Sequence, residues 1–112
     1  MGLQRTSFQA VIVTEEQLPA AIEFYRQAFD MDVSATSPIG AKLTGAGFTI
    51  YLRVGDPPGL VLQEFKVTGD DDIETRLLGL GCELVTLDGQ AHTSTGFLVK
   101  DPFGMAFQVF HG

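Results

Sequence analysis

The feature that most constrains the fold of this chain is an internal repeat. The segments Phe8–Thr14 and Leu62–Thr68 match at a constant spacing of 54 residues, close to half of the 112-residue chain, and Gln, Val and Thr recur at equivalent positions. Both segments alternate β-branched or aromatic residues with other types, which is typical of a strand with one buried face. We therefore expect two similar units in tandem.

A helix is predicted after each repeated strand. In the first half Pro19 is compatible with an opening turn, and the apolar positions at helical spacing are Leu18, Ala21, Ile22, Tyr25 and Phe29. In the second half the aspartates at 70–72 supply an N-cap and negative charge at the positive helix end, with Gly79 or Gly81 closing the helix. The apolar stripe of this second helix is expected to be Ile73, Leu77 and Leu78.

Three short strands are expected after each helix, separated by turns that contain glycine or proline. They are Asp32–Thr36, Ala41–Thr44 and Phe48–Val54, and then Glu83–Asp88, Gly96–Lys100 and Met105–His111. The fold class predicted is α+β, with two βαβββ modules in one domain that spans residues 1–112. Module 1 covers about residues 6–55 and module 2 about residues 60–112, joined by the linker Gly55–Gly59.

Charge and composition restrict the partners. The net charge of −7 argues against nucleic acid or an anionic membrane, since both require a basic surface. No run approaches the ~20 apolar residues of a membrane span. The single Cys82 excludes an internal disulfide and indicates a reducing, cytoplasmic location.

Two local motifs, together with the repeat, resemble the vicinal-oxygen-chelate superfamily, which includes glyoxalases, bleomycin-resistance proteins and extradiol dioxygenases. Ala20–Arg26 resembles the signature of that family's first helix, and Val99–Gly104 resembles its V-x-D-P-x-G turn before the last strand. The resemblance covers nearly the whole chain. It implies a curled mixed sheet around a ligand cavity, and a homodimer in which neighbouring chains complete each other's pockets.

The resemblance also implies where metal ligands would lie, because the family usually holds its metal with two His and two Glu from the first and fourth strands of each module. Carried over onto this sequence, these positions fall on Phe8, Leu62, Tyr51 and Gln108. A longer loop after the first strand leaves Gln9 and Ala10 open as alternatives to Phe8. Since none of these residues is a normal ligand of a divalent ion, we expect neither a metal nor another cofactor.

Strand alternation identifies the residues that would line the cavity once the apolar partners face the helices. The ligand-binding candidates are Phe8, Ile12, Tyr51, Arg53, Leu62, Glu64, Lys66, Gln108 and Phe110. Glu64 is the one weak candidate for a catalytic group, as a general base whose pKa burial would raise. The equally weighted alternative is that Glu64 pairs with Lys66 or Arg53 and only satisfies a buried charge.

Three further residues are candidates for a functional role. His92 lies in the polar, glycine-bounded loop 88–96, where an exposed histidine is the simpler interpretation and a contact at the rim of a pocket is the alternative. His111 is expected to be solvated. Phe103, in the turn before the last strand, indicates either a contact surface or a packed loop tip.

The sequence therefore predicts a small-molecule-binding protein of the glyoxalase/bleomycin-resistance type that sequesters an organic ligand, such as an antibiotic or a metabolite, without a metal. The alternative is an atypical enzyme of the same superfamily, a lyase, isomerase or dioxygenase-like protein, that uses carboxylate and basic residues of the pocket.

Overall fold

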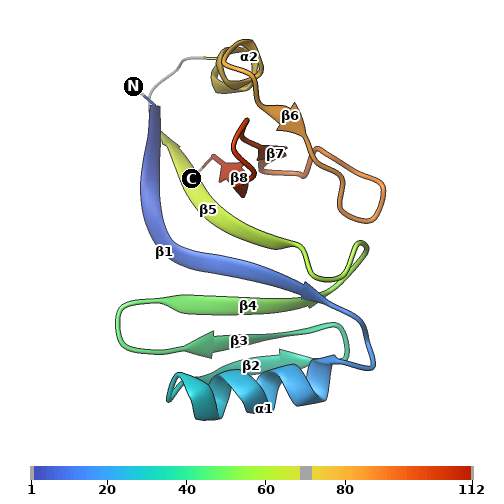
Figure 1. Cartoon of the computed structure of the whole chain (residues 1–112). Helices are drawn as coiled ribbons and strands as arrows, with labels where there is room; N and C mark the ends of the chain where they lie inside the picture. The colour runs from blue at the N-terminus through green and yellow to red at the C-terminus, as the bar shows by residue number, and fades with distance from the viewer. Residues whose placement is uncertain (1, 69–71, 112) are drawn as a thin grey trace. The chain divides into compact units, whose positions relative to one another are not determined.

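A computed structural model of the chain describes residues 2–68 and 72–111, which form an α+β fold (Figure 1). The order of elements is βαβββ twice, as the repeat predicts. The elements are β1 (Gly2–Val13), α1 (Leu18–Ala28), β2 (Asp32–Ser37), β3 (Gly40–Thr44), β4 (Thr49–Val54), β5 (Val61–Thr68), α2 (Ile73–Gly79), β6 (Glu83–Leu84), β7 (Gly96–Lys100) and β8 (Ala106–Phe110).

The chain divides into two compact units. Unit A contains Ser7–Val61, and unit B contains the chain up to Thr6 together with the chain from Leu62 onward. The strand order in unit A is β2-β3-β4-β1, in which β1 is parallel to β4 and the other neighbours are antiparallel. In unit B the order is β1-β5-β8-β7-β6, in which β5 is parallel to β8 and β8, β7 and β6 are antiparallel neighbours. Strand β1 thus contributes residues to both units.

The core of unit A lies between α1 and one face of its strands. Alternate residues of β1 and β4, including Val13, Ile50 and Leu52, pack against Leu18 and its apolar neighbours on α1. The fully buried Leu43 of β3 lies in the same cluster. This confirms the predicted alternation, in which the residues between them, such as Tyr51, lie on the opposite face.

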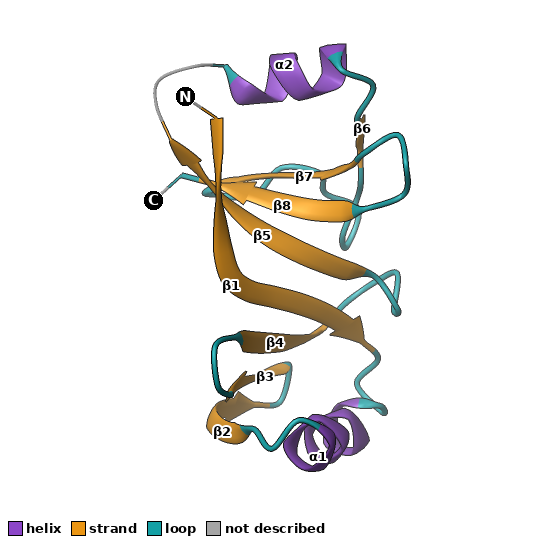
Figure 2. Cartoon of the chain, turned by 60° about the vertical axis from the view of Figure 1, so that its left-hand side comes forward, coloured by secondary structure: helices purple, strands orange, loops and turns teal. Residues whose placement is uncertain are grey.

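Unit B repeats the arrangement with α2 (Figure 2). Ile73 and Leu77 of α2 pack with Val99, Phe107 and Val109, which belong to β7 and β8. Phe65 and Val67 of β5 pack against the same cluster, as predicted from their alternation with Glu64 and Lys66.

The helix ends match the sequence signals. Pro19 lies in the first turn of α1, and after that helix Asp30 takes a left-handed conformation with φ 53°. Asp72 is the N-cap of α2, where its side chain accepts a hydrogen bond from Thr75 N–H, whereas positions 70 and 71 lie outside the described residues. Of the two candidate closing glycines, Gly81 has the positive φ, 102°.

Two details differ from expectation. The strand expected over Glu83–Asp88 is only Glu83–Leu84, because the chain turns back at Asp88 and Gly89, both of which have positive φ, and Leu87 pairs with Gln90 instead. Leu78 does not belong to the buried stripe of α2, since 39% of it is exposed. The helix has only seven residues, so its buried face is narrow.

Gly96 provides a test of the packing of β7 against β8. A Cβ at this position would lie 1.7 Å from Val109 O, a backbone atom that cannot move aside alone. Gly96→Ala is therefore expected to lower the free energy of unfolding by about 1–3 kcal/mol or more, measured by urea denaturation.

The matched control is Gly79→Ala at the end of α2, where a Cβ meets nothing within 4 Å. The control should keep or slightly raise stability, by at most about 1 kcal/mol. Equal stability of both variants would contradict the register of β7 and β8.

Candidate functional site

The helix-free sheet face of unit A carries four of the predicted binding residues. The register of β1 with β4 sets Phe8 beside Thr49, Ala10 beside Tyr51 and Ile12 beside Arg53. Ile12 is buried, with 1% exposed, whereas Phe8 and Tyr51 are half-buried and Arg53 is exposed. The structure thus brings these residues together on neighbouring strands, although it does not test their role.

Aromatic contacts organise this face. The rings of Phe8 and Tyr51 meet edge to face with centroids 5.8 Å apart, and Lys42 Nζ lies 5.8 Å from the centroid of the Tyr51 ring. Lys42 reaches this ring because β3 pairs Lys42 directly with Tyr51. A half-buried aromatic pair with a cation over one of its rings offers apolar surface and one positive charge to a ligand. Lys42 was missed in the sequence because β3 was assessed only as a strand, without its partner.

The helix-free face of unit B carries the other five candidates. The register of β5 with β8 sets Glu64 beside Gln108 and Lys66 beside Phe110. Leu62 is buried with 1% exposed, and Lys66 is exposed. Leu98 of β7 adds a second buried leucine to this face, since β7 pairs it with Gln108. This face is therefore an apolar surface on which the carboxyl group of Glu64 and the amide of Gln108 lie side by side.

Glu64 is the unusual group on this face. Its side chain is half-buried, and burial raises the pKa of its carboxyl group above the usual value of 4.5. No cation contributes to that shift, and among the residues that the structure describes no ion pair involves Glu64. Burial is the cause of the raised pKa, and whether Glu64 binds a ligand or satisfies a buried charge stays a prediction. A carboxyl group that loses solvent without gaining a partner favours its neutral form, or a donor from a ligand.

The residues onto which the resemblance carries the family's metal-ligand positions do not fit a metal. Phe8 and Leu62 offer no donor atom, and the phenol of Tyr51 and the amide of Gln108 are poor ligands for a divalent ion. Residues 2–68 and 72–111 contain no group of three or more His, Cys, Asp or Glu side chains that could hold a metal ion. No step of any mechanism can be assigned to a metal through these side chains.

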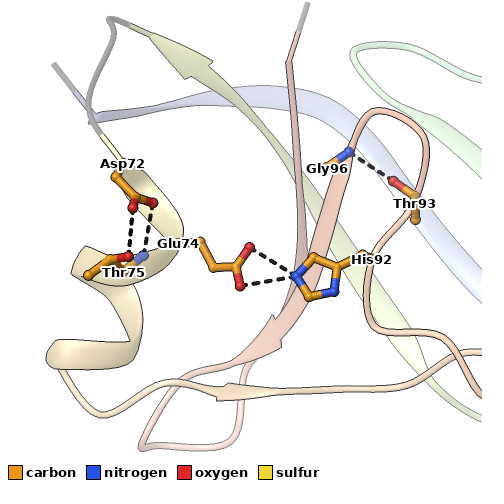
Figure 3. A network of polar contacts seen from close by, with 6 residues as sticks. All are labelled: Asp72, Glu74, Thr75, His92, Thr93 and Gly96. Atoms are coloured by element: carbon orange, nitrogen blue, oxygen red, sulfur yellow. Dashed lines mark hydrogen bonds and ion pairs between the residues drawn. The ribbon is translucent and has the colours of Figure 1, made fainter.

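A second polar region lies elsewhere in unit B (Figure 3). His92 Nε2 lies 3.0 Å from both carboxylate oxygens of Glu74, and so connects the loop 88–96 to α2. Thr93 Oγ1 accepts a hydrogen bond from Gly96 N–H at 2.9 Å, which closes the end of the loop. The His92 side chain is 57% exposed, as predicted, and Glu74 was not identified because the two residues are 18 positions apart.

This loop borders an open pocket of about 360 Å³. His111, exposed as expected, also lines it. The lining polar groups are largely occupied by one another, since Asp72 caps α2 and Thr93 bonds within its own loop. The exposed contact between His92 and Glu74 contributes little to stability. We assign it the role of holding the loop.

Solved structures provide the comparison. No family model and no curated protein sequence matches the chain. Homoprotocatechuate 2,3-dioxygenase from Arthrobacter globiformis superposes on 98% of this chain and 36% of its own, with TM-score 0.64 and 20% identity. The complex of the Brevibacterium fuscum enzyme with 3,4-dihydroxyphenylacetate superposes on 98% of this chain and 37% of its own, with TM-score 0.62 and 21% identity. The chain therefore shares its fold with a part of these dioxygenases.

This chain spans only about a third of the length of those dioxygenases. A protein of similar length, described as an NAD-dependent benzaldehyde dehydrogenase from Legionella pneumophila, matches over 92% of this chain and 97% of its own, with TM-score 0.61 and 18% identity. At these identities the likeness establishes the fold alone. Among the described helices, none has the length and apolar character needed to cross a bilayer.

The pKa of Glu64 generates a testable prediction. Because its folded pKa is raised, this group stabilises the protein most below the unfolded value of 4.5, and the contribution is lost as pH rises through the folded pKa. Glu64→Gln should therefore gain stability relative to the wild type as pH rises from about 4 to about 7, measured by urea denaturation.

Glu23→Gln is the matched control with the opposite sign. Hydrogen bonds from Arg26 and Gln27 lower the pKa of Glu23 to about 2, so its contribution is present above 4.5 and lost as pH falls toward 2. A Glu64→Gln difference that does not change with pH would show that Glu64 is fully solvated, and one that falls as pH rises would show that it is paired with a cation.

Proposed function

We propose that this protein is a small-molecule-binding protein of the glyoxalase/bleomycin-resistance type, which holds an organic ligand on its helix-free sheet faces without a metal. The observation that carries the proposal is Glu64, a half-buried carboxyl group with no cationic partner among the described residues, on a face with the buried Leu62 and Leu98. A few polar groups on an apolar surface are what orient a small ligand.

The chemistry of the two faces indicates the kind of ligand. Glu64 and its neighbour Gln108 together accept and donate hydrogen bonds, so a ligand with an N–H or O–H group satisfies the carboxylate. In unit A the ring pair of Phe8 and Tyr51 favours a flat aromatic or otherwise apolar group. An organic molecule with an apolar body and hydrogen-bond donors matches the face of unit B, as an antibiotic or a metabolite would.

The second candidate function is an atypical enzyme of the same superfamily. The observation in its favour is again the raised pKa of Glu64, because a carboxyl group shifted toward neutral pH can exchange a proton with a substrate. The neighbours of Glu64 that the structure describes on its face, Leu62, Leu98 and Gln108, offer no nucleophile, so we prefer the binding function. We further propose that the protein acts in the cytoplasm as a homodimer.

Both candidate functions are tested by measuring how much small molecule the purified protein retains. Protein purified from its own host should carry a small molecule detectable by native mass spectrometry. Glu64→Gln, which keeps the side-chain shape but removes the charge, should retain roughly tenfold less, on the order of one charge-assisted hydrogen bond. His92→Ala is the control, and its occupancy should equal that of the wild type.

The outcomes separate the two functions. A binding protein releases its molecule chemically unchanged after incubation. An enzyme converts the molecule, and Glu64→Gln then abolishes conversion while occupancy stays largely intact. Equal occupancy of the wild type and Glu64→Gln, without conversion, would contradict the assignment of Glu64 to the site.

A further inference from the structure

The helix-free face of unit A carries positive charge, although the chain as a whole is acidic. The chain has 7 Lys and Arg residues against 14 Asp and Glu, which is two acidic side chains for each basic one. The pairing of β3 with β4 sets Lys42 opposite Tyr51 and Gly40 opposite Arg53 (Figure 1). Since directly paired residues share a face of the sheet, two of the basic side chains lie on this one face.

The ammonium group of Lys42 has no carboxylate partner within the chain. The residue is half-buried, and its Nζ lies 5.8 Å from the centroid of the Tyr51 ring. Among residues 2–68 and 72–111, no Asp or Glu side chain forms an ion pair with Lys42. The face of a ring attracts a cation, but it does not supply the hydrogen-bond acceptors that the three N–H groups require. An anion from outside the chain would supply them.

The hydroxyl group of Tyr51 is a second polar group available beside Lys42. Tyr51 is half-buried, and its contacts are those of its ring, with Phe8 and with Lys42. In the part of the chain that the structure describes, its hydroxyl group has no hydrogen-bond partner. A phenol donates readily to an anion, and that hydrogen bond is stronger than one to a neutral acceptor.

Space for an anion lies between Lys42 and Arg53. They are diagonal neighbours on adjacent strands, positions that lie about 7–8 Å apart in a sheet. The residue opposite Arg53 is Gly40, so β3 places no side chain there. Packing also requires this glycine, because a Cβ would lie 2.7 Å from Leu52 O. Both basic side chains are long enough to reach one anion bound beside the glycine.

The net charge of the face indicates a monoanion. Among the paired residues of β1 to β4, the register adds one carboxylate to this face, the exposed Asp32, which pairs with Thr44. Asp32 lies one row beyond Lys42, on the side away from Arg53. Two positive charges against one negative leave an excess of one, which a carboxylate balances and a phosphate dianion would exceed.

We propose that the helix-free face of unit A binds an organic carboxylate that has a flat apolar body. The carboxylate lies between Lys42 and Arg53 and accepts a hydrogen bond from the Tyr51 hydroxyl group. The apolar body packs against the ring pair of Phe8 and Tyr51. This inference rests on the proposed binding function and names the ligand class that unit A takes.

The test is the affinity of the full chain for benzoate, measured by NMR titration of the backbone amide signals at neutral pH. Benzamide is the uncharged probe of the same shape, and inorganic phosphate is an anion without an apolar body. For benzoate a dissociation constant on the order of 1 mM is expected for a fragment of this size. Benzamide and phosphate should bind at least about tenfold more weakly, and the shifted signals should belong to β1, β3 and β4.

Two variants and one control assign the affinity to the named groups. Lys42→Met removes the charge but keeps the length of the side chain, and should raise the benzoate constant at least about tenfold. Tyr51→Phe removes only the hydroxyl group and should raise it about fivefold. Both should leave the benzamide constant unchanged. Lys100→Met is the matched control, because it removes an exposed cation of unit B and alters the net charge equally, and it should change neither constant.

The outcomes separate this inference from the proposed function. Equal affinity for benzoate and benzamide, or tighter binding of phosphate, would overturn the carboxylate site. Equal losses in Lys42→Met and Lys100→Met would overturn it too, because net charge alone would then explain the attraction. None of these results alters the retention experiment with Glu64→Gln, which reports on unit B. A protein that binds benzoate through Lys42 but retains nothing from its host would contradict the proposed function and keep the carboxylate site.

Discussion

The structure depends on one constraint: along a β-strand, successive side chains point to opposite faces of the sheet. In β1 and β5 the residues that face a helix are apolar, and burial of that set fixes the direction of every residue between them. Val13 and Phe65 pack into the two helix-covered cores, and Ile12 and Glu64 are consequently placed on the opposite faces. The residues available for a ligand are thus determined by the register that builds the core. A shift of one residue would exchange core and binding face completely.

This constraint explains why much of the fold could be predicted. The repeat, the helical spacing around Leu18 and the capping role of Asp72 are local signals, and the structure confirms each of them. The prediction of a strand over Glu83–Asp88 was wrong in extent. The chain turns back at Asp88–Gly89, and the alternation of apolar and polar residues does not reveal the conformation of that turn.

Less of the candidate site than of the fold could be predicted from the sequence. The alternation gave the face on which Glu64 lies, but not whether a cation accompanies it, since that depends on contacts between strands. Both Lys42 against Tyr51 and Glu74 against His92 are contacts across the chain that no local pattern indicates.

The central proposal is that the protein binds its ligand without a metal, because the resemblance carries the family's ligand positions onto Phe8, Leu62, Tyr51 and Gln108. The most direct measurement is elemental analysis by mass spectrometry of protein expressed in medium supplemented with Mn, Fe, Ni and Zn, and then dialysed. The account predicts well under one metal ion per chain, and the same low content in Gln108→Ala. One tightly held equivalent per chain that is lost in Gln108→Ala would contradict it.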